Sequence, residues 1–126
     1  MSARPSGARN YPRVARLNHL IHEIVAEEME RIDDDRLELV TVIRVAVDPD
    51  MRHAVVYYDT LTGPDDDDAA RAGLADHRVR LQAAIGRQAR IKRVPELTFR
   101  PDEAERTAAR VEEILTRLRD RQPPGG

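Results

Sequence analysis

The sequence contains no cysteine and no tryptophan, and its aromatic residues amount to three tyrosines and one phenylalanine. Without cysteine, disulfides and thiolate metal sites are excluded. Because aromatic residues are so few, a core has to be built from leucine, isoleucine, valine and alanine. No run approaches the roughly 18 apolar residues of a membrane-spanning helix, and no apolar stretch follows the first arginines as it does in a secretory signal. We therefore expect a cytoplasmic protein without membrane contact.

Sequence motifs of enzymes are absent as well. The chain has no P-loop, no dinucleotide-binding glycine motif and no nucleophile elbow, and its four histidines form no HExxH pair. The run Asp65–Asp68 lacks the alternating ligand positions and the glycine turn of a calcium loop. Such a run is typical of a helix start, where the helix dipole favours carboxylates. We expect no catalytic residue, no bound metal, no cofactor and no small-molecule substrate.

The overall composition is that of one globular domain. The chain has 126 residues, of which 40% are hydrophobic and 35% charged. At this length, folding buries on the order of two-thirds of the unfolded surface, which is enough for a single core. Proline and glycine gather at both ends of the chain. We expect a flexible segment over residues 1–11, a domain over 12–119 and a disordered tail over 120–126.

The first half predicts a helix followed by two strands. From Pro12, apolar residues recur every three or four positions until "DDDR" at 33–36, which predicts an amphipathic helix with glutamates on its other side. Residues 37–47 and 53–61 are rich in β-branched residues and are separated by an Asp-Pro turn, which predicts an antiparallel hairpin. We expect one face of this hairpin to carry Leu39, Thr41, Ile43, Val45, Val47, Ala54, Val56 and Tyr58. Tyr57 should lie on the opposite face, where a single aromatic is too little for a base-stacking surface.

The second half predicts a broken helix, a strand and a last helix. The helical pattern from about Asp66 to Ala89 loses its phase between residues 76 and 79, so a kink is expected there. Residues 92–99 read as an edge strand, because Pro95 cannot donate a hydrogen bond to a neighbouring strand. A last helix follows Asp102, its expected N-cap. The apolar positions of this helix are Ala104, Ala108, Val111, Leu115 and Leu118.

These elements predict an α+β fold of two layers. Strands two and three are joined through a helix, so this connection is a crossover, and the helices should cover one face of a three-stranded sheet. The predicted order is α-β-β-α(kinked)-α-β-α, in which the kink divides the long helix.

Charge is segregated along the chain. The segment from Arg71 to Arg100 holds eight basic residues against Asp76 and Glu96, a balance of +6 in a chain of −2. Four of these cations fall within residues 87–93. A positive stripe of this density is typical of a surface that binds a phosphate backbone. The alternative is a solvated helix face balanced by the acidic first helix.

Three segments together resemble the ribosome-binding factor A family. They are "RVARLNHLIHEIVAEEM" (13–29), "DDRLELVTVIRVAVDPDMRHAVVYY" (34–58) and "LQAAIGRQARIKRVPELTFRPD" (81–102). The resemblance extends over about Arg13 to Leu118. It implies a KH-like fold of the bacterial type II, and binding to the immature free 30S subunit through 16S rRNA. It also implies a role in late maturation and 5′-end rRNA processing, and importance for growth in the cold.

The resemblance places RNA contacts on the kinked helix and the strand after it. We predict a non-enzymatic, monomeric assembly factor whose RNA-binding residues are His77, Arg78, Arg80, Arg87, Arg90, Lys92 and Arg93. At the kink the family usually has Ala-x-Gly, where this chain has His77-Arg78-Val79. The main alternative is a protein-interaction domain that uses its acidic first helix and does not bind RNA. A small enzyme using a histidine and an aspartate is a more remote one.

Overall fold

The computed structural model of the chain describes residues 6–121 and has the predicted order of elements. Helix α1 spans Ser6–Glu30 and is followed by the hairpin strands β1 (Val40–Val47) and β2 (His53–Thr60). Helices α2 (Asp67–Asp76) and α3 (Arg78–Gln88) come next, then strand β3 (Glu96–Pro101) and helix α4 (Glu103–Arg121). Two short 3₁₀ helices, η1 (Asp35–Leu37) and η2 (Gly63–Asp66), precede β1 and α2. None of the described helices is long and apolar enough to cross a membrane.

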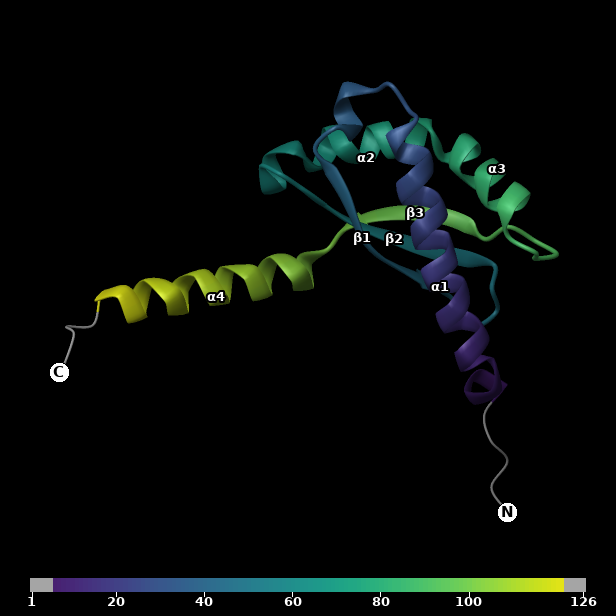
Figure 1. Cartoon of the computed structure of the whole chain (residues 1–126), viewed down its shortest axis with the longest axis horizontal. Helices are drawn as coiled ribbons and strands as arrows, with labels where there is room; N and C mark the ends of the chain where they lie inside the picture. Colours follow the sequence, from purple (N-terminus) through teal and green to yellow (C-terminus); the bar gives the residue numbers. More distant parts are fainter. Residues whose placement is uncertain (1–5, 122–126) are drawn as a thin grey trace, which may run out of the picture.

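The sheet is mixed and has the strand order β1-β2-β3. Strand β1 pairs with β2 antiparallel, and β3 pairs with β2 in parallel, so α2 and α3 form the predicted crossover. Figure 1 shows α1, α2 and α3 on one side of the sheet, as expected, and none of the helices in residues 6–121 covers the other side. The two-layer α+β architecture is therefore confirmed.

The core lies between these three helices and the sheet. It is aliphatic, as the scarcity of aromatic residues requires, and Tyr58 on β2 is its largest fully buried side chain. From the helices it takes Ile21 and Val25 on α1, Leu74 on α2, and Leu81 and Ile85 on α3, all completely buried. Helix α1 packs mainly against β1, and α2 and α3 pack against β3.

Strand β1 differs from the prediction because it contains a β-bulge. Val42 pairs with Tyr58 and Arg44 with Tyr57, so Ile43 is the extra residue. The inward face therefore consists of Val42, Val45 and Val47, and the prediction for Leu39, Thr41 and Ile43 is wrong. A bulge reverses the alternation of side chains, and periodicity alone does not show where this happens. On β2, Ala54, Val56 and Tyr58 are buried as predicted.

Two boundaries also differ. Strand β3 starts at Glu96 and not at residue 92, because the chain before Pro95 forms an irregular connection. Helix α1 starts at Ser6, so Pro12 lies inside it, whereas we expected the helix to begin at that proline. Residues 1–5 and 122–126, part of the two predicted flexible ends, lie outside the described residues.

Helix α4 extends away from the helical layer (Figure 1) and has no buried residue. We had expected all helices to cover the sheet. Only the base of α4 is fixed: Asp102 is its N-cap, as predicted, and accepts a 3.1 Å hydrogen bond from the N–H of Glu105. One turn along, Arg106 binds Asp67 through both terminal nitrogens, at 2.6 and 2.7 Å.

Candidate RNA interface

The predicted kink is a single residue, His77, between α2 and α3. Its N–H points back to the carbonyls of Gly73 and Leu74, at 3.3 and 3.2 Å, and its carbonyl accepts from the N–H of Leu81 at 3.0 Å. His77 has φ −103° and ψ 10°, a conformation that needs no glycine. Among the described residues, positive φ occurs only at Met51 and Gly63. The turn between α2 and α3 is therefore made without a glycine.

His77 is directed toward the domain. Its Nε2 lies 2.9 Å from Oδ2 of Asp34, the residue that caps η1. Asp34 also accepts hydrogen bonds from the side chain and the backbone of Arg36. These bonds, those of the Arg36 side chain first and that of His77 second, hold the pKa of Asp34 well below its usual range. His77 therefore fastens the kink to η1, and its predicted phosphate contact has to compete with Asp34.

Two further predicted residues have carboxylate partners. Arg80 donates from Nε to Oε2 of Glu28 at 2.8 Å, and the Glu28 side chain is only 6% exposed. Arg80, and next to it Arg31, lower the pKa of Glu28 against the opposing effect of burial. Nη1 of Arg78 lies 3.9 Å from Oε1 of Glu96, a longer and more exposed pair. The first turn of α3 is thus tied to α1 and β3.

The other four predicted residues have no such partner within residues 6–121. Arg87 lies in the last turn of α3, and Arg90, Lys92 and Arg93 lie in the connection 89–95; all four are exposed. None of them is within 4.0 Å of a carboxylate oxygen in the described part of the chain.

The connection presents its cations because its apolar residues face inward. Ala89 and Pro95 are buried, and Ile91 and Val94 are partly buried against the core. A Cβ at Gly86 would lie 3.3 Å from Cγ2 of Val94, so the absence of a side chain there lets the connection fold closely against α3. The apolar side chains therefore face the core and the basic ones between them face solvent, which fixes where the charges lie.

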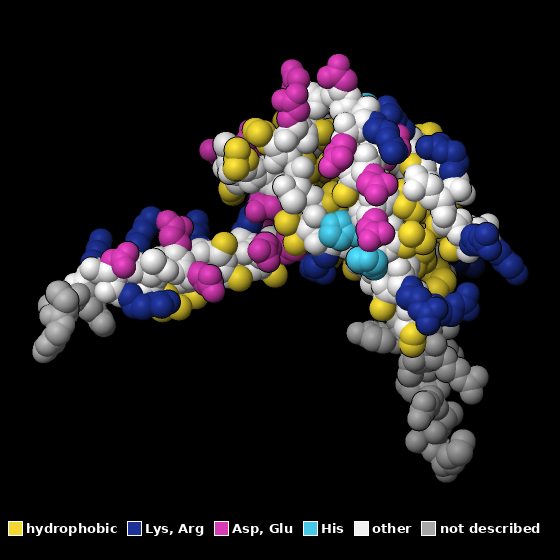
Figure 2. Space-filling model, in the orientation of Figure 1, with side chains coloured by type: hydrophobic (Ala, Val, Ile, Leu, Met, Phe, Trp, Pro, Cys, Tyr) yellow, Lys and Arg dark blue, Asp and Glu magenta, His cyan; other side chains and the backbone are white. Residues whose placement is uncertain are grey.

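Helix α1 adds two cations that the sequence analysis did not assign. Arg13 and Arg16 are exposed, and α1 packs against α3. Figure 2 shows Lys and Arg side chains gathered along α3 and over the neighbouring part of α1. The signal that could have identified them is the change of sign along this helix, from arginine before residue 17 to glutamate after residue 22. We call the set Arg13, Arg16, Arg87, Arg90, Lys92 and Arg93 the cationic surface.

Two further groups of polar residues lie outside the cationic surface. Arg44 lies over the ring of Tyr57, 3.8 Å from its centroid, so one face of this aromatic is covered. Asp48, Asp50 and His53 bring three possible metal-binding groups within 4.8 Å of one another at the hairpin turn, but all three are exposed. The aspartate run at 65–68 serves structure: Asp67 binds Arg106, whereas Asp68 is fully exposed.

Comparison with known proteins finds relatives of this chain in both sequence and fold. The family model for ribosome-binding factor A matches residues 13–115. The ribosome-binding factor A of Rubrobacter xylanophilus is 40% identical over 104 residues, which cover 82% of this chain and 84% of that protein. The crystal structure of the Thermus thermophilus factor superposes with a TM-score of 0.64 at 32% identity, over 70% of this chain and 93% of that one. A homology model of the Thermus thermophilus factor, fitted into the cryo-EM map of a 30S complex, is similar with a TM-score of 0.57, 31% identity, and coverage of 68% and 91%. The KH-like fold is thereby confirmed.

Proposed function

The chain belongs to the ribosome-binding factor A family, and from that premise we propose that it binds the immature small ribosomal subunit through the cationic surface. The observation that carries the proposal is the set Arg87, Arg90, Lys92 and Arg93, exposed and without carboxylate partners in the described structure. The fit of the Thermus thermophilus factor into a 30S complex supports the same type of target.

The chemistry of the cationic surface suits rRNA phosphates. Arginine presents a planar fork of donors that can bind a phosphate through two hydrogen bonds. Each phosphate contact also releases condensed counterions, so affinity should fall steeply with salt. With four contacts, the logarithm of the binding constant should decrease by roughly three for each tenfold increase in salt.

The contribution to maturation would be non-enzymatic. No histidine, carboxylate and nucleophile converge in a cavity of the described residues, and His77 and Glu28 are occupied by structural contacts. A protein that covers rRNA can change which segments are accessible to the nucleases that trim its 5′ end. We propose that this chain assists late maturation and 5′-end processing in the cytoplasm in that way, as a monomer on the free 30S subunit.

The alternative function, a protein-interaction domain that docks through the acidic face of α1, is less well supported by the structure than by the sequence. Of its four glutamates, Glu28 is buried beneath Arg80 and Arg31, and Glu23 lies 2.9 Å from His19. Fewer charges therefore remain for a partner than the sequence suggests.

The test is co-sedimentation of the purified chain with small subunits. Arg90→Glu with Arg93→Glu should abolish association and leave the circular dichroism spectrum and the unfolding midpoint unchanged. The matched control is Arg110→Glu with Arg119→Glu, because these exposed arginines of α4 give the same change in net charge away from the cationic surface. Retained association of the first variant, or equal loss in both, would remove the proposed role of this surface.

A further inference from the structure

Strand β1 lies at an edge of the sheet, and the phase of its ladder shows which backbone groups point outward. The N–H of Leu61 donates to the carbonyl of Leu39 at 3.1 Å, so these two residues form a hydrogen-bonded pair. In an antiparallel ladder, such pairs alternate with pairs that are not hydrogen-bonded to each other. The pairs Val40–Thr60 and Val42–Tyr58 are therefore pairs that are not hydrogen-bonded to each other. Their N–H and C=O groups therefore face the free edge.

Helix α1 satisfies only part of this edge. Nε2 of His22 lies 3.0 Å from the carbonyl of Val42, and Oδ1 of Asn18 accepts from the N–H of Val47 at 2.7 Å. Both contacts lie at or beyond Val42. No described hydrogen bond involves the outward N–H and C=O of Val40 or the N–H of Val42. An edge whose backbone groups are unpaired is a template for another strand.

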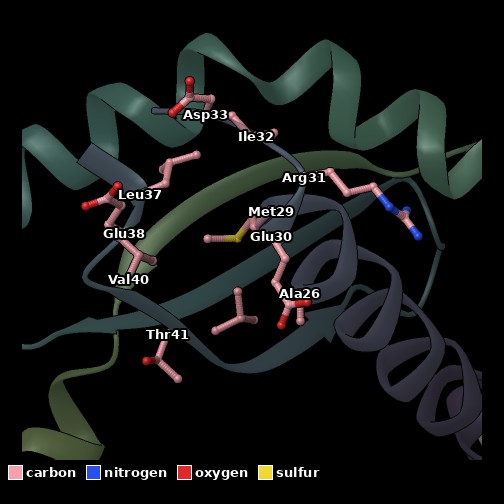
Figure 3. Close-up of a pocket in the computed structure, with 11 residues that line it drawn as sticks. Ala26, Met29, Glu30, Arg31, Ile32, Asp33, Leu37, Glu38, Val40 and Thr41 are labelled. Atoms are coloured by element: carbon pink, nitrogen blue, oxygen red, sulfur yellow. The ribbon is translucent and has the colours of Figure 1, made fainter. Parts of the chain in front are cut away.

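The open part of the edge forms one wall of a groove on the described chain. The groove has a volume of about 670 Å³ and lies between the carboxyl end of α1, η1 and the start of β1. In Figure 3, Met29 from α1, Leu37 from η1 and Val40 from β1 surround the same space. Ile32 and Val42 extend this apolar lining. Alternate side chains of an added strand would enter it, because they point to one face with a period of two.

The rim of the groove is negative. Glu30, Asp33 and Glu38 line it without ion-pair partners in the described structure. Arg31 is the single cation of the lining, and its Nη1 lies 3.3 Å from Oε1 of Glu28. The carboxyl end of α1 adds the negative end of the helix dipole. The groove therefore favours a positively charged occupant.

We propose that this groove binds an extended, basic peptide segment of a partner protein, which adds as a strand to β1 at Val40 and Val42. Backbone hydrogen bonds and alternate apolar side chains would provide affinity, and the acidic rim would select for lysine and arginine. A second copy of the chain is disfavoured, because two acidic rims would meet. The site lies at the opposite edge of the sheet from β3, away from the connection 89–95, and it goes beyond the proposed rRNA contact.

The first test uses a fluorescent peptide in which arginine alternates with valine. Its length of about nine residues is within the usual range for a strand. Binding to the full chain is measured by fluorescence polarisation, and amide hydrogen exchange is followed by NMR. We expect this peptide to bind at least tenfold more tightly than an arginine–proline peptide of equal charge, which cannot form a strand. A glutamate–valine peptide should not bind. The amides of Val40 and Val42 should exchange more slowly in the complex.

A pair of matched variants separates the groove from general charge. Asp33→Lys with Glu38→Lys should weaken binding about tenfold. Glu105→Lys with Glu112→Lys, on exposed α4, changes net charge equally and should leave binding intact. Equal weakening by both pairs, or unchanged exchange at Val40, would overturn the proposal. Protection of Val40 through self-association without peptide would assign the edge to a second copy instead. Because the assay contains no RNA, its result is independent of the rRNA proposal.

Discussion

Nε of Arg80 on α3 donates a 2.8 Å hydrogen bond to Oε2 of Glu28 on α1, whose side chain is 6% exposed. The pair gives the two ends of α3 different roles. At its amino-terminal end, charge is used to fasten the helix to α1, whereas at its carboxyl end Arg87 is exposed and without a carboxylate neighbour in the described structure. Arginines on one helix therefore divide between folding and proposed RNA binding.

This division predicts opposite effects of two alanine substitutions. Arg80→Ala should lower the midpoint of thermal unfolding by several degrees, because it leaves Glu28 buried without its main partner. Arg90→Ala should leave the midpoint unchanged. It should remove one phosphate contact and so reduce the slope of log K against log salt concentration for rRNA binding by about one. Thermal unfolding and filter binding at several salt concentrations measure the two effects. A stable Arg80→Ala variant would contradict the structural role of this pair.

The base of α4 should depend on Arg106. Its side chain is 14% exposed and binds both oxygens of Asp67, and its Nε donates to Asp59 at 2.7 Å. Arg106→Ala leaves two carboxylates unpaired and should reduce the free energy of unfolding by about 2–3 kcal/mol. Urea titration measures the change. Arg110→Ala, one turn further along the exposed helix, is the control and should have almost no effect.

Acid should destabilise the fold through the same ion pairs. Contacts with arginine lower the pKa values of Glu28 and Asp67, so both carboxylates stabilise the folded state when ionised. This stabilisation is complete above their unfolded pKa values of about 4 and is lost as the pH falls through the lower folded values. Asp67→Asn should be less stable than the parent protein at pH 7, and the two curves should converge near pH 2. If the difference in stability between Asp67→Asn and the parent protein stayed constant from pH 7 to pH 2, the stabilising role of the ionised Asp67 carboxylate would be contradicted.

The kink should tolerate changes at Val79, which lies in the first turn of α3 and is 76% exposed. Val79→Gly introduces the glycine that the family resemblance leads us to expect there, yet it should reduce the free energy of unfolding by about 0.5 kcal/mol, because the position is helical. Val79→Ala should raise it by a similar amount. Affinity for rRNA should be unchanged in both variants. A several-fold gain with glycine alone would show that close backbone approach matters more than side-chain charge.

Much of the fold follows from periodicity, and the departures have local causes. The break at His77 could be predicted because the apolar stripe is interrupted between Leu74 and Leu81, where His77 and Arg78 stand at the positions that should be apolar. The face of β1 could not, because a bulge at Ile43 leaves no compositional mark. The free position of α4 was missed because an amphipathic stripe indicates a helix face without saying whether a partner covers it.

The candidate site was predictable only as a segment. Sequence spacing placed seven polar residues together, but His77 and Arg80 turn toward Asp34 and Glu28, which precede them by more than forty positions. Such long-range pairing depends on the tertiary fold. In the same way, Arg13 and Arg16 join the cationic surface only because α1 packs against α3.

The parallel pairing of β2 with β3 affects the order in which the parts of the chain fold. Ala54 lies opposite Leu97, so residues 61–95 must be synthesised and closed into a loop before that contact can form. Non-local pairing of this kind is slow relative to helix or hairpin formation. The cations just before β3 therefore acquire their fixed spacing late, and a nascent or partly folded chain would not yet present the proposed rRNA-binding surface.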